Sequence, residues 1–505
     1  MLLNFSNLWE GAQLLFTPGV LIAIPLGCFV GILLGAVPGM TGSSLLAIFL
    51  PIVIFIDPMP ALAFMLAMFV TDNWGGAFSG IVMNIPTTGS STATAIDGYA
   101  LTKQGRAGEA LAVGRSAAFA GGIFGAIVLM FLAPTVAHLA VKFGPAEYLA
   151  LAVFGVTMVS AVSSAPVVMA LMSAWVGFLL ASVGQDIFTG YARFTFGMRD
   201  LWQGVDLIWV ILGLFAIVQG YELLMGRDER RQYKGKIDVP WRSAWPVLWK
   251  RKRVVATSAL IGTGVGVAPG AGGTVAAWIA YNAARRVSKD PTPFGQGNLD
   301  GVIAPETAGD GAEGGDLVPT MALGIPGGGS TAVLLAGFTL AGLRPGPQLF
   351  QTQAPEAVSI MLMFVLANIL FLFIAVFAMR VLVLILKVDP RIWPPMIMVV
   401  AIFGAFTVYQ TMFGSYVMLV IGISMFGLKL LGFPQAPMLL GFILGPIVDS
   451  NWTRIGELSH GDPIPFILDR PVAIVIFILA LIAVALDVRR QLQDRREAKA
   501  VAHAA

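Results

Sequence analysis

The sequence predicts an all-α polytopic membrane protein built as two repeats of inverted topology, with about 10–12 membrane segments. The first observation is composition: of 505 residues, 57% are hydrophobic and only 12% are charged, which is typical of multi-pass membrane proteins. The second is that several apolar runs are interrupted by Pro-Gly pairs. The third is that these interruptions recur at a fixed spacing. Each repeat is therefore expected to contain a re-entrant helical hairpin and a broken transmembrane helix.

The interrupted runs come in two matching pairs. Residues 38–42 and 269–273 each divide an apolar run into two arms that are short against the ~20 residues needed to cross a bilayer. Five residues recur with an offset of 231: Gly31, Gly35, Pro38, Gly39 and Gly42 correspond to Gly262, Gly266, Pro269, Gly270 and Gly273. A second break, at residues 84–91, matches residues 324–331 with an offset of 240. The pattern indicates two copies of one unit.

Basic residues set the predicted orientation. No Lys or Arg precedes Lys103, so the loops of the opening segments are expected outside, whereas residues 226–253 hold ten basic residues against three acidic ones. Basic clusters flank the second hairpin on both sides, so it is expected to open to the inner face, opposite to the first. We therefore divide the chain into a first membrane repeat at 1–225, a basic cytoplasmic linker at 226–253, a second membrane repeat at 254–488 and a polar C-terminal tail at 489–505.

The remaining apolar runs predict crossings. They lie near residues 110–140, 147–165, 166–183 and 205–225 in the first repeat, and near 356–387, 392–415, 416–433 and 472–487 in the second. Whether 435–449 crosses is left open, and the arginines of the tail favour an inner C-terminus. The first apolar run lacks a basic region before it and is expected to be retained. Four acids before the second break are expected in a solvated loop: Glu306, Asp310, Glu313 and Asp316.

The two pairs of breaks predict a binding site. Helix N-termini expose N–H groups that attract anions, and a broken helix at membrane depth is tolerated where it is buried in protein or lines a cavity. The expected substrate-binding residues are the glycines and hydroxyls of the breaks: Gly39, Thr41, Ser43, Thr87, Thr88, Ser90, Gly270, Gly272, Thr274, Gly327, Gly328, Ser330 and Thr331. A coupling cation, Na⁺ or H⁺, is expected at Asp72, Asn73 and Asn84.

Other kinds of site find little support. The glycine pairs 31/35 and 262/266 have the spacing that usually serves close helix packing, not ligand contact. The glycines at 262–266 do not predict a nucleotide loop, because no strand precedes them and no Gly-Lys follows. One cysteine and three scattered histidines favour no metal centre, and no catalytic residue set is recognisable. We therefore expect no cofactor besides the coupling ion, no nucleic-acid partner and no enzyme activity.

Further motifs carry a resemblance to one family. Residues 97–99 (DGY), 103–108 (KQGRAG), 304–306 (APE) and 323–327 (LGIPG), with Asn84-Ile85-Pro86 and both Pro-Gly hairpins, resemble the large permease subunit (TctA) of the tripartite tricarboxylate transporters over nearly the whole chain. The resemblance implies a bacterial inner-membrane symporter, with a small four-helix membrane subunit (TctB-like) and a periplasmic solute-binding protein (TctC-like) as partners. It implies citrate or another carboxylate as substrate. Residues 40–42, 87 and 309–310 depart from the family pattern near the expected ligand, so the anion is left open.

Together these observations predict a subunit of a secondary active transporter. It is expected to take up a tricarboxylate or related organic acid, delivered by the periplasmic binding protein, by cation-coupled symport across the lipid bilayer. By analogy with other hairpin-bearing transporters, the two pairs of breaks are expected to form a moving, elevator-like domain. The alternative is an ion channel or facilitator for small anions, because hydroxyl-rich breaks also suit the lining of a pore.

Overall fold

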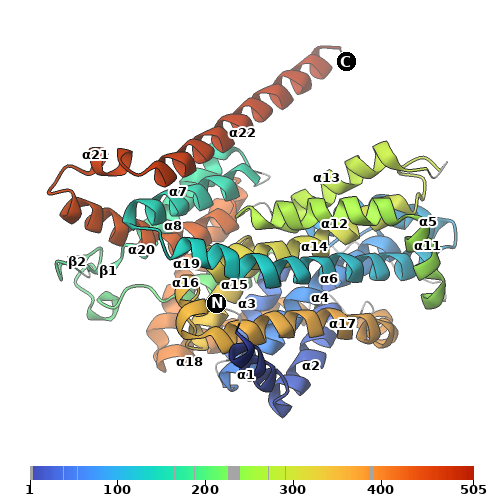
Figure 1. Cartoon of the computed structure of the whole chain (residues 1–505), viewed down its shortest axis with the longest axis horizontal. Coiled ribbons are helices and arrows are strands. Elements are labelled where there is room, and N and C mark those ends of the chain that lie inside the picture. The colour runs from blue at the N-terminus through green and yellow to red at the C-terminus, as the bar shows by residue number, and fades with distance from the viewer. Residues whose placement is uncertain are drawn as a thin grey trace. The chain divides into compact units, whose positions relative to one another are not determined.

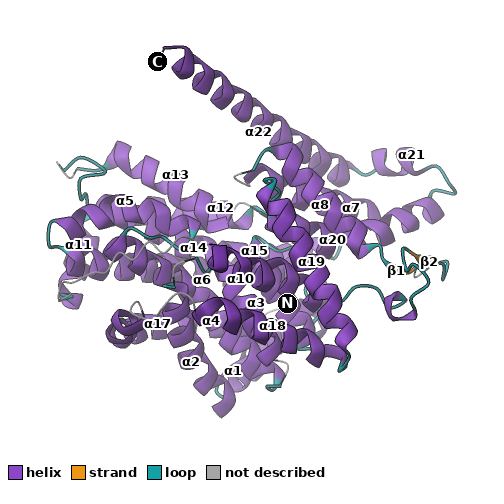
Figure 2. Ribbon diagram, turned by 180° about the vertical axis from the view of Figure 1, so that it is seen from behind, coloured by secondary structure: helices purple, strands orange, loops and turns teal. Residues whose placement is uncertain are grey.

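The computed structural model describes residues 4–37, 39–53, 55–162, 165–186, 188–225, 239–270, 272–289, 292–385 and 392–504. The fold over these ranges is almost entirely helical, as predicted (Figure 1). The only strands in these ranges are two short ones, β1 (Gly184–Gln185) and β2 (Ala192–Arg193), which pair antiparallel in one loop (Figure 2). Most of the predicted basic linker, residues 226–238, and two hairpin residues, Pro38 and Ala271, lie outside the described ranges.

The chain forms two compact units, each assembled from two distant segments. Unit 1 comprises Met1–Ala140 and Phe215–Thr411, and unit 2 comprises Val141–Leu214 and Met412–Ala505. Each unit thus takes residues from both predicted repeats. The two repeats are defined by the sequence and stay a prediction. The two units are defined by which segments pack together in the structure.

Unit 1 holds all four predicted interruptions. Its first segment contains α1 (Phe5–Leu15), α2 (Pro18–Gly35), α3 (Gly42–Val53), α4 (Pro58–Met83), α5 (Gly89–Lys103) and α6 (Ala107–Ala140). Its second segment contains α10 (Val218–Met225), the 3₁₀ turn η3 (Trp241–Ser243), α11 (Ala244–Lys250), α12 (Lys252–Val267), α13 (Gly272–Val287), α14 (Asp300–Leu323), α15 (Gly329–Leu340), α16 (Pro347–Thr352), α17 (Ala354–Ile385) and α18 (Trp393–Tyr409).

Unit 2 is smaller. It contains α7 (Pro145–Val162), α8 (Val167–Ala181), β1, β2, the 3₁₀ turn η1 (Arg199–Leu201), α9 (Leu207–Ile211), α19 (Met412–Leu430), α20 (Gln435–Leu458), α21 (Pro463–Leu468) and α22 (Pro471–Ala504). The π-helical stretch η2 (Leu212–Ile217) joins α9 to α10. Residues 435–449, whose crossing was left open, belong to the 24-residue helix α20.

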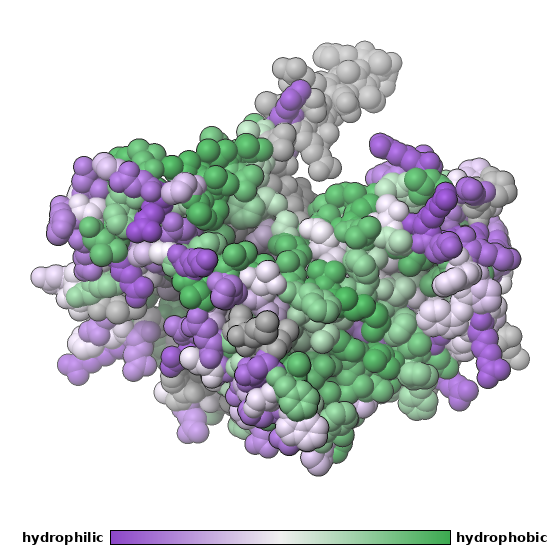
Figure 3. Space-filling model, viewed as in Figure 1, coloured by the Kyte–Doolittle hydropathy of each residue, from purple (hydrophilic) through white to green (hydrophobic). Residues whose placement is uncertain are grey.

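Several helices have the length and composition of membrane spans. Among the described residues six qualify: Pro18–Gly35, Pro58–Met83, Ala107–Ala140, Leu207–Met225, Ala354–Leu382 and Met412–Leu430. Further apolar helices have 10–17 residues. On one face of unit 1, hydrophobic side chains extend along α6 and α17, where Phe131 and Phe377 are exposed (Figure 3). The chain is therefore a multi-pass membrane protein, and the larger number of segments and their orientation stay predictions.

Helices α4 and α14 run in opposite directions through unit 1. Ile81, near the end of α4, and Val302, near the start of α14, lie 3.8 and 3.5 Å from the position that a Cβ on Gly114 of α6 would occupy. Asn73, eight residues before Ile81, bonds Asp310, eight residues after Val302, so the two helices are antiparallel. Both are buried over most of their length.

The paired glycines of α2 and α12 serve helix packing, as their spacing predicts. A Cβ on Gly35 would overlap the backbone of Asp72 in α4, and one on Gly266 would overlap the backbone of Ala312 in α14. Gly35 and Gly266 are related by the offset of 231, and Asp72 and Ala312 by the offset of 240. The two helix pairs therefore pack through equivalent residues, with the backbones brought together where no side chain intervenes.

One buried carboxylate ties α5 to the loop before α14. Asp97 Oδ1 accepts hydrogen bonds from the backbone N–H groups of Gly295, Gly297 and Asn298 at 2.8, 3.0 and 2.9 Å. Its Oδ2 accepts from the Tyr281 hydroxyl of α13 at 2.8 Å. Asp97 is fully buried. The Asp-Gly-Tyr motif therefore has a structural role, because its acid holds three elements of unit 1 together.

Replacing Asp97 with alanine is expected to destabilise unit 1 by about 3 kcal/mol or more, since four donors lose their acceptor and each buried unsatisfied donor costs about 1–3 kcal/mol. Tyr281→Phe removes a single bond to the same carboxylate and is expected to cost about 1.5–3 kcal/mol. Thermal unfolding of detergent-purified protein measures the difference. Asp57→Ala is the control, because Asp57 is exposed and its side chain does not cap α4. If Asp97→Ala unfolds at the same temperature as wild type, Asp97 does not have this structural role.

Basic side chains gather at the same end of unit 1. Gln104, just after α5, donates from Nε2 to the Gln296 carbonyl at 2.8 Å, and Arg251 Nε lies 2.8 Å from Asp300 Oδ1 at the start of α14. The ends of α5 and α13 and the starts of α12 and α14 therefore meet there, where hydrophilic side chains are prominent (Figure 3). The exposed bases are Lys103, Arg106, Lys250, Lys252, Arg253, Arg285, Arg286 and Lys289. Clustering at one end agrees with the predicted cytoplasmic placement of these residues.

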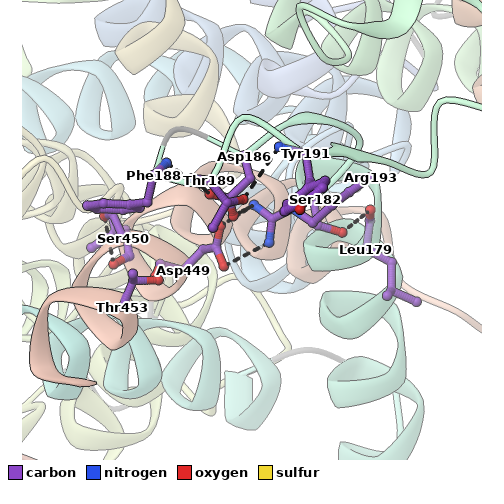
Figure 4. A network of polar contacts seen from close by, with 11 residues as sticks. Leu179, Ser182, Asp186, Phe188, Thr189, Tyr191, Arg193, Asp449, Ser450 and Thr453 are labelled. Carbon is purple, nitrogen blue, oxygen red and sulfur yellow. Dashed lines mark hydrogen bonds and ion pairs between the residues drawn. The ribbon is translucent and has the colours of Figure 1, made fainter. Parts of the chain in front are cut away.

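In unit 2 an ion-pair network fixes the loop that carries β1 and β2 (Figure 4). Arg193 donates from Nη1 and Nη2 to the two Asp449 oxygens of α20, at 3.2 and 2.5 Å, and its Nη2 lies 3.1 Å from Asp186 Oδ2. The hydrogen bond to Asp449 raises the pKa of Arg193. The Thr189 N–H, donating to Asp186 Oδ1 at 2.7 Å, holds the pKa of Asp186 below its usual value. Arg193 therefore serves this loop and not a ligand.

Candidate functional site

Both predicted helix breaks are present and are built alike. α4 ends at Asn84 and α14 at Gly324, residues related by the offset of 240. Both have left-handed backbone, with φ of 58° and 70°, which stops a helix. A proline follows two residues later in each copy, at Pro86 and Pro326, and prevents the helix from resuming at once.

The helices that follow the breaks begin with matching side-chain caps. The Thr88 N–H donates to Ser91 Oγ at 3.1 Å before α5, and the Gly328 N–H donates to Thr331 Oγ1 at 2.8 Å before α15. Thr331 was predicted to bind substrate, and its hydroxyl is used here to start a helix. The capped turns hold the first residues of α5 and α15 in place.

The hairpin turns share one backbone conformation and contact the breaks of their own half. Gly39 and Gly270 have φ of 86° and 88°. The Gly270 N–H donates to the Gly327 carbonyl at 2.6 Å in the second half. In the first half the Thr87 hydroxyl donates to the Gly35 carbonyl at the end of α2, also at 2.6 Å. Each hairpin is thus fastened to a break, and the predicted residues Thr87, Gly270 and Gly327 belong to these fastenings.

The breaks also contact the hairpin of the opposite half. A Cβ on Gly89, the first residue of α5, would overlap the side chain of Thr274 in the first turn of α13. A Cβ on Gly42, the first residue of α3, would overlap Asp72 Oδ2 and lie 3.0 Å from Ser330 Oγ at the start of α15. The N-terminus of α5 therefore lies against that of α13, and the N-terminus of α3 lies against that of α15. Four helix N-termini, each with a partial positive charge, are paired in unit 1.

Asn73 links the first break to α14. Its Oδ1 accepts from the Thr88 hydroxyl at 3.1 Å and from the Ser90 hydroxyl in a shorter contact. Its Nδ2 donates to Asp310 Oδ1 at 2.6 Å. All of these groups are buried or half-buried. One predicted cation residue therefore joins two predicted substrate residues to an acid on the other long helix.

The predicted cation residues do not form one group. Asp72 lies beside Gly42 at the start of α3, and Asn73 faces α14. Asn84 lies eleven residues further along α4, which places it about 16 Å from Asn73 along the helix axis. It is exposed and ends α4 in left-handed backbone. The structure therefore gives Asn84 a role in the break itself.

The remaining predicted residues lie at the hairpin turns. Thr41 Oγ1 and Ser44 Oγ are 2.8 Å apart, and Ser44 Oγ donates to Gln219 Oε1 of α10 at 3.1 Å. Ser43 is half-buried at the start of α3. A Cβ on Gly272, which has φ of 60°, would meet no atom within 4 Å, so space remains beside the second hairpin. Thr41 is thus engaged within its own turn, whereas Gly272 borders open space.

The prediction of a solvated acidic loop before the second break is wrong. Residues 300–323 form α14, which is buried along its whole length, and its acids are buried with it. The four acids of the predicted loop are Glu306, Asp310, Glu313 and Asp316, and Asp300 at the start of α14 is buried as well. The loop was predicted because many glycines and acids give the segment low hydropathy. Those glycines instead allow close packing: a Cβ on Gly314 would overlap the backbone of Gly125 in α6, and one on Gly315 the backbone of α12.

Helical spacing is the signal that identifies these acids from sequence. Residues 306, 310 and 313 are separated by four and three positions, which puts their side chains on one face of a helix. That face meets α4 and α5, since Asp310 bonds Asn73 and Glu306 Oε1 accepts from the Thr94 hydroxyl at 2.6 Å. Asp316 lies against the second break, where a Cβ on Gly327 would overlap its backbone. The acids therefore line the same region as the breaks.

Each of the four acids has a buried oxygen without a hydrogen-bond partner. These atoms are Glu306 Oε2, Asp310 Oδ2, Glu313 Oε2 and Asp316 Oδ1. Within the described ranges no Lys, Arg or His forms an ion pair with any of them. Residues 306, 310 and 313 lie one helical turn apart on one face, so their charges repel one another when ionised. Several ionised carboxylates buried without a base are costly unless a proton or cation neutralises them.

Broken helices in a multi-pass membrane protein, with paired N-termini beside buried acids, are typical of membrane transport proteins. The sequence agrees with the family of one such class, because residues 21–440 match the model of the "Tripartite tricarboxylate transporter TctA family". The chain belongs to that family, whose members are components of tripartite transporters and not enzymes.

Two curated proteins of Agrobacterium vitis are similar to this chain. An "Uncharacterized 52.8 kDa protein in TAR-I ttuC' 3'region" is 31% identical over 495 residues, which covers 97% of this chain and 98% of the relative. An "Uncharacterized protein in TAR-II ttuC' 3'region" is 30% identical over 236 residues, 47% of this chain and 97% of the relative. No solved structure matches.

Proposed function

We propose that this chain is the large membrane subunit of a bacterial inner-membrane symporter that takes up a tricarboxylate or related organic acid with Na⁺ or H⁺. A periplasmic solute-binding protein delivers the acid, and a small four-helix membrane subunit completes the transporter. Membership of the TctA family supports the tripartite arrangement. The antiparallel course of α4 and α14 supports two repeats of inverted topology, with hairpins that open to opposite faces.

The observation that carries the proposal is the pairing of helix N-termini across the two halves. Gly89 lies against Thr274, and Gly42 lies against Ser330. Helix N-termini offer N–H groups and a favourable dipole to a carboxylate, and Ser330 and Thr274 add hydroxyl donors. An organic anion is held there without a buried arginine.

The acids of α14 supply a physical reason for coupling. A substrate carboxylate near Thr88 and Ser90 lies close to Asp310, because Asn73 bonds to all three. Two like charges at this depth repel strongly. The anion therefore binds well only after a cation has neutralised the acid, and cation binding and anion binding favour each other by the same factor.

The alternative is a channel or facilitator for small anions, in which the same hydroxyls line a pore. A carrier must bind its substrate and its ion before each transfer, so its flux saturates and depends on the ion gradient. A channel passes anions without saturation and requires no coupling ion. Kinetics therefore separate the two functions.

The test is uptake into proteoliposomes that contain this chain and its small membrane subunit, with the binding protein present. The probes are ¹⁴C-citrate and a panel of four- to six-carbon di- and tricarboxylates, under an imposed Na⁺ or pH gradient. We expect saturable uptake of at least one acid, lost when an ionophore removes the gradient. Flux that rises linearly with concentration and ignores both gradients would establish the channel instead.

A further inference from the structure

We propose that the coupling ion is a proton carried on Oδ2 of Asp310. Asn73 holds the Asp310 carboxylate beside the Thr88 and Ser90 hydroxyls of the proposed substrate site, so this inference rests on the proposed function. Asp310 is fully buried in α14. One of its oxygens accepts from Asn73, and the other has no partner. The hydrogen bond to one oxygen keeps the carboxyl group in position, while the other oxygen is available to gain and lose a proton.

The surroundings of Asp310 contain acids and hydroxyls but no base. Its own helix offers Glu306 and Glu313, four and three residues away, and α4 offers Asp72, the neighbour of Asn73 in the chain. From α5 the Ser90 side chain lies nearby, since a Cβ on Gly309 would be 3.3 Å from Ser90 Cβ and 2.8 Å from Asn73 Nδ2. No positive charge within the described ranges is placed to neutralise Asp310.

The charged and titratable groups that are buried or half-buried on the other elements near α14 include Asp97, Tyr281, Arg115 and Arg251, and each of these is bound elsewhere. On α5, Asp97 binds the loop before α14 and Tyr281 of α13. On α6, Arg115 donates to the Leu372 carbonyl at 2.6 Å and stacks on Trp241. Arg251, which precedes α12, pairs with Asp300. These groups hold unit 1 together and leave Asp310 dependent on a proton or cation from solution.

The unpartnered oxygen of Asp310 is the geometric basis for assigning a proton as the coupling ion. A proton needs only one lone pair on Asp310 Oδ2. In the step proposed, the carboxylate takes a proton from a hydronium ion, which becomes water, and the neutral acid later returns the proton to water.

Asn73 connects this step to substrate binding. Its Oδ1 holds the hydroxyls of Thr88 and Ser90, and its Nδ2 holds Asp310. A carboxylate at the N-terminus of α5, next to these hydroxyls, lies roughly 8–10 Å from Asp310. Repulsion over that distance weakens anion binding on the order of tenfold when Asp310 is ionised. Neutral Asp310 is therefore the form that binds substrate.

The first measurement follows the proton without any substrate. Infrared difference spectra of the purified full chain, titrated over pH, report the C=O stretch of protonated carboxyl groups. Asp310→Asn is expected to remove one titrating component, whereas Asp57→Asn, at an exposed position, leaves it. Asn73→Ser removes the donor that favours the ionised form and is expected to move the titration to higher pH. Its matched control is Asn368→Ser, because Asn368 is a buried amide that bonds only its own helix at Phe364.

The second measurement follows transport. Asp310→Asn is expected to lose uptake driven by a pH gradient but to retain substrate exchange across the membrane. A merely structural defect would abolish the exchange as well. The proposal is overturned if Asp310→Asn keeps the infrared component or keeps pH-driven uptake, or if ²²Na⁺ binds wild type and requires Asp310. If Asp310→Asn does not fold, the shift in Asn73→Ser against Asn368→Ser decides. If the proposed function is wrong, the wild-type protein shows no uptake. The infrared titration does not depend on uptake, so it still tests whether Asp310 binds a proton.

Discussion

Leucine in place of Gly270 is expected to abolish uptake while the chain still inserts into the membrane. Gly270 has φ of 88°, a conformation in which an L side chain costs roughly 1–2 kcal/mol. Its N–H also donates to the Gly327 carbonyl at 2.6 Å, which fastens the second hairpin to the second break. A side chain there moves the turn and separates two parts of the proposed site. Insertion depends on the long apolar helices, which the substitution leaves unchanged.

Gly39→Leu makes the same change in the first hairpin. Gly39 has φ of 86°, and its Cβ would lie 2.8 Å from Leu223 Cδ2, so strain and overlap combine. Gly264→Leu is the matched control: Gly264 is an exposed glycine of α12, and its Cβ would meet no atom within 4 Å. Uptake and membrane content are measured for all three variants. If both hairpin variants take up substrate as well as wild type, the Pro-Gly turns are not part of the substrate site.

Local signals explain why much of the fold was predictable. Proline interrupts a helix, so the Pro-Gly turns at Gly39 and Gly270, the break at Pro86 after α4 and the break at Pro326 after α14 follow from the sequence alone. The offset of 231 also relates Gly35 to Gly266, and both pack on equivalent residues of a long helix. Duplication therefore predicted contacts as well as helix ends.

The burial of α14 was not predictable from hydropathy. Acids and glycines lower its hydropathy as a loop does, and only the spacing of residues 306, 310 and 313 distinguishes a helix with one acidic face. The division into two units has no local signal at all, because it depends on long-range packing of segments far apart in sequence. Among the site residues, sequence identified Asn73 but not its partner Asp310, since that contact joins two helices 237 positions apart.

A disulfide between positions 89 and 274 is expected to form and to abolish uptake. The Cβ of a residue at 89 would lie 2.9 Å from Thr274 Cβ, and a disulfide needs about 3.5–4.5 Å, so a shift of about 1 Å suffices. Cys28, the single natural cysteine, is buried and is first replaced by serine. Gly89→Cys with Thr274→Cys in that background joins α5 to α13. Oxidation is expected to stop uptake, and reduction to restore it.

The pair tests whether the two halves meet at the site. Each single variant controls for the substitution, and Gly89→Cys with Gly264→Cys controls for oxidation, because position 264 faces open space. Loss of maleimide-reactive thiols reports the bond. If no disulfide forms, the first break does not lie against the second hairpin, and the N-termini of α5 and α13 are not paired. If the bond forms and uptake continues unchanged, these helix ends neither move nor bind during transport, and the anion must be held elsewhere.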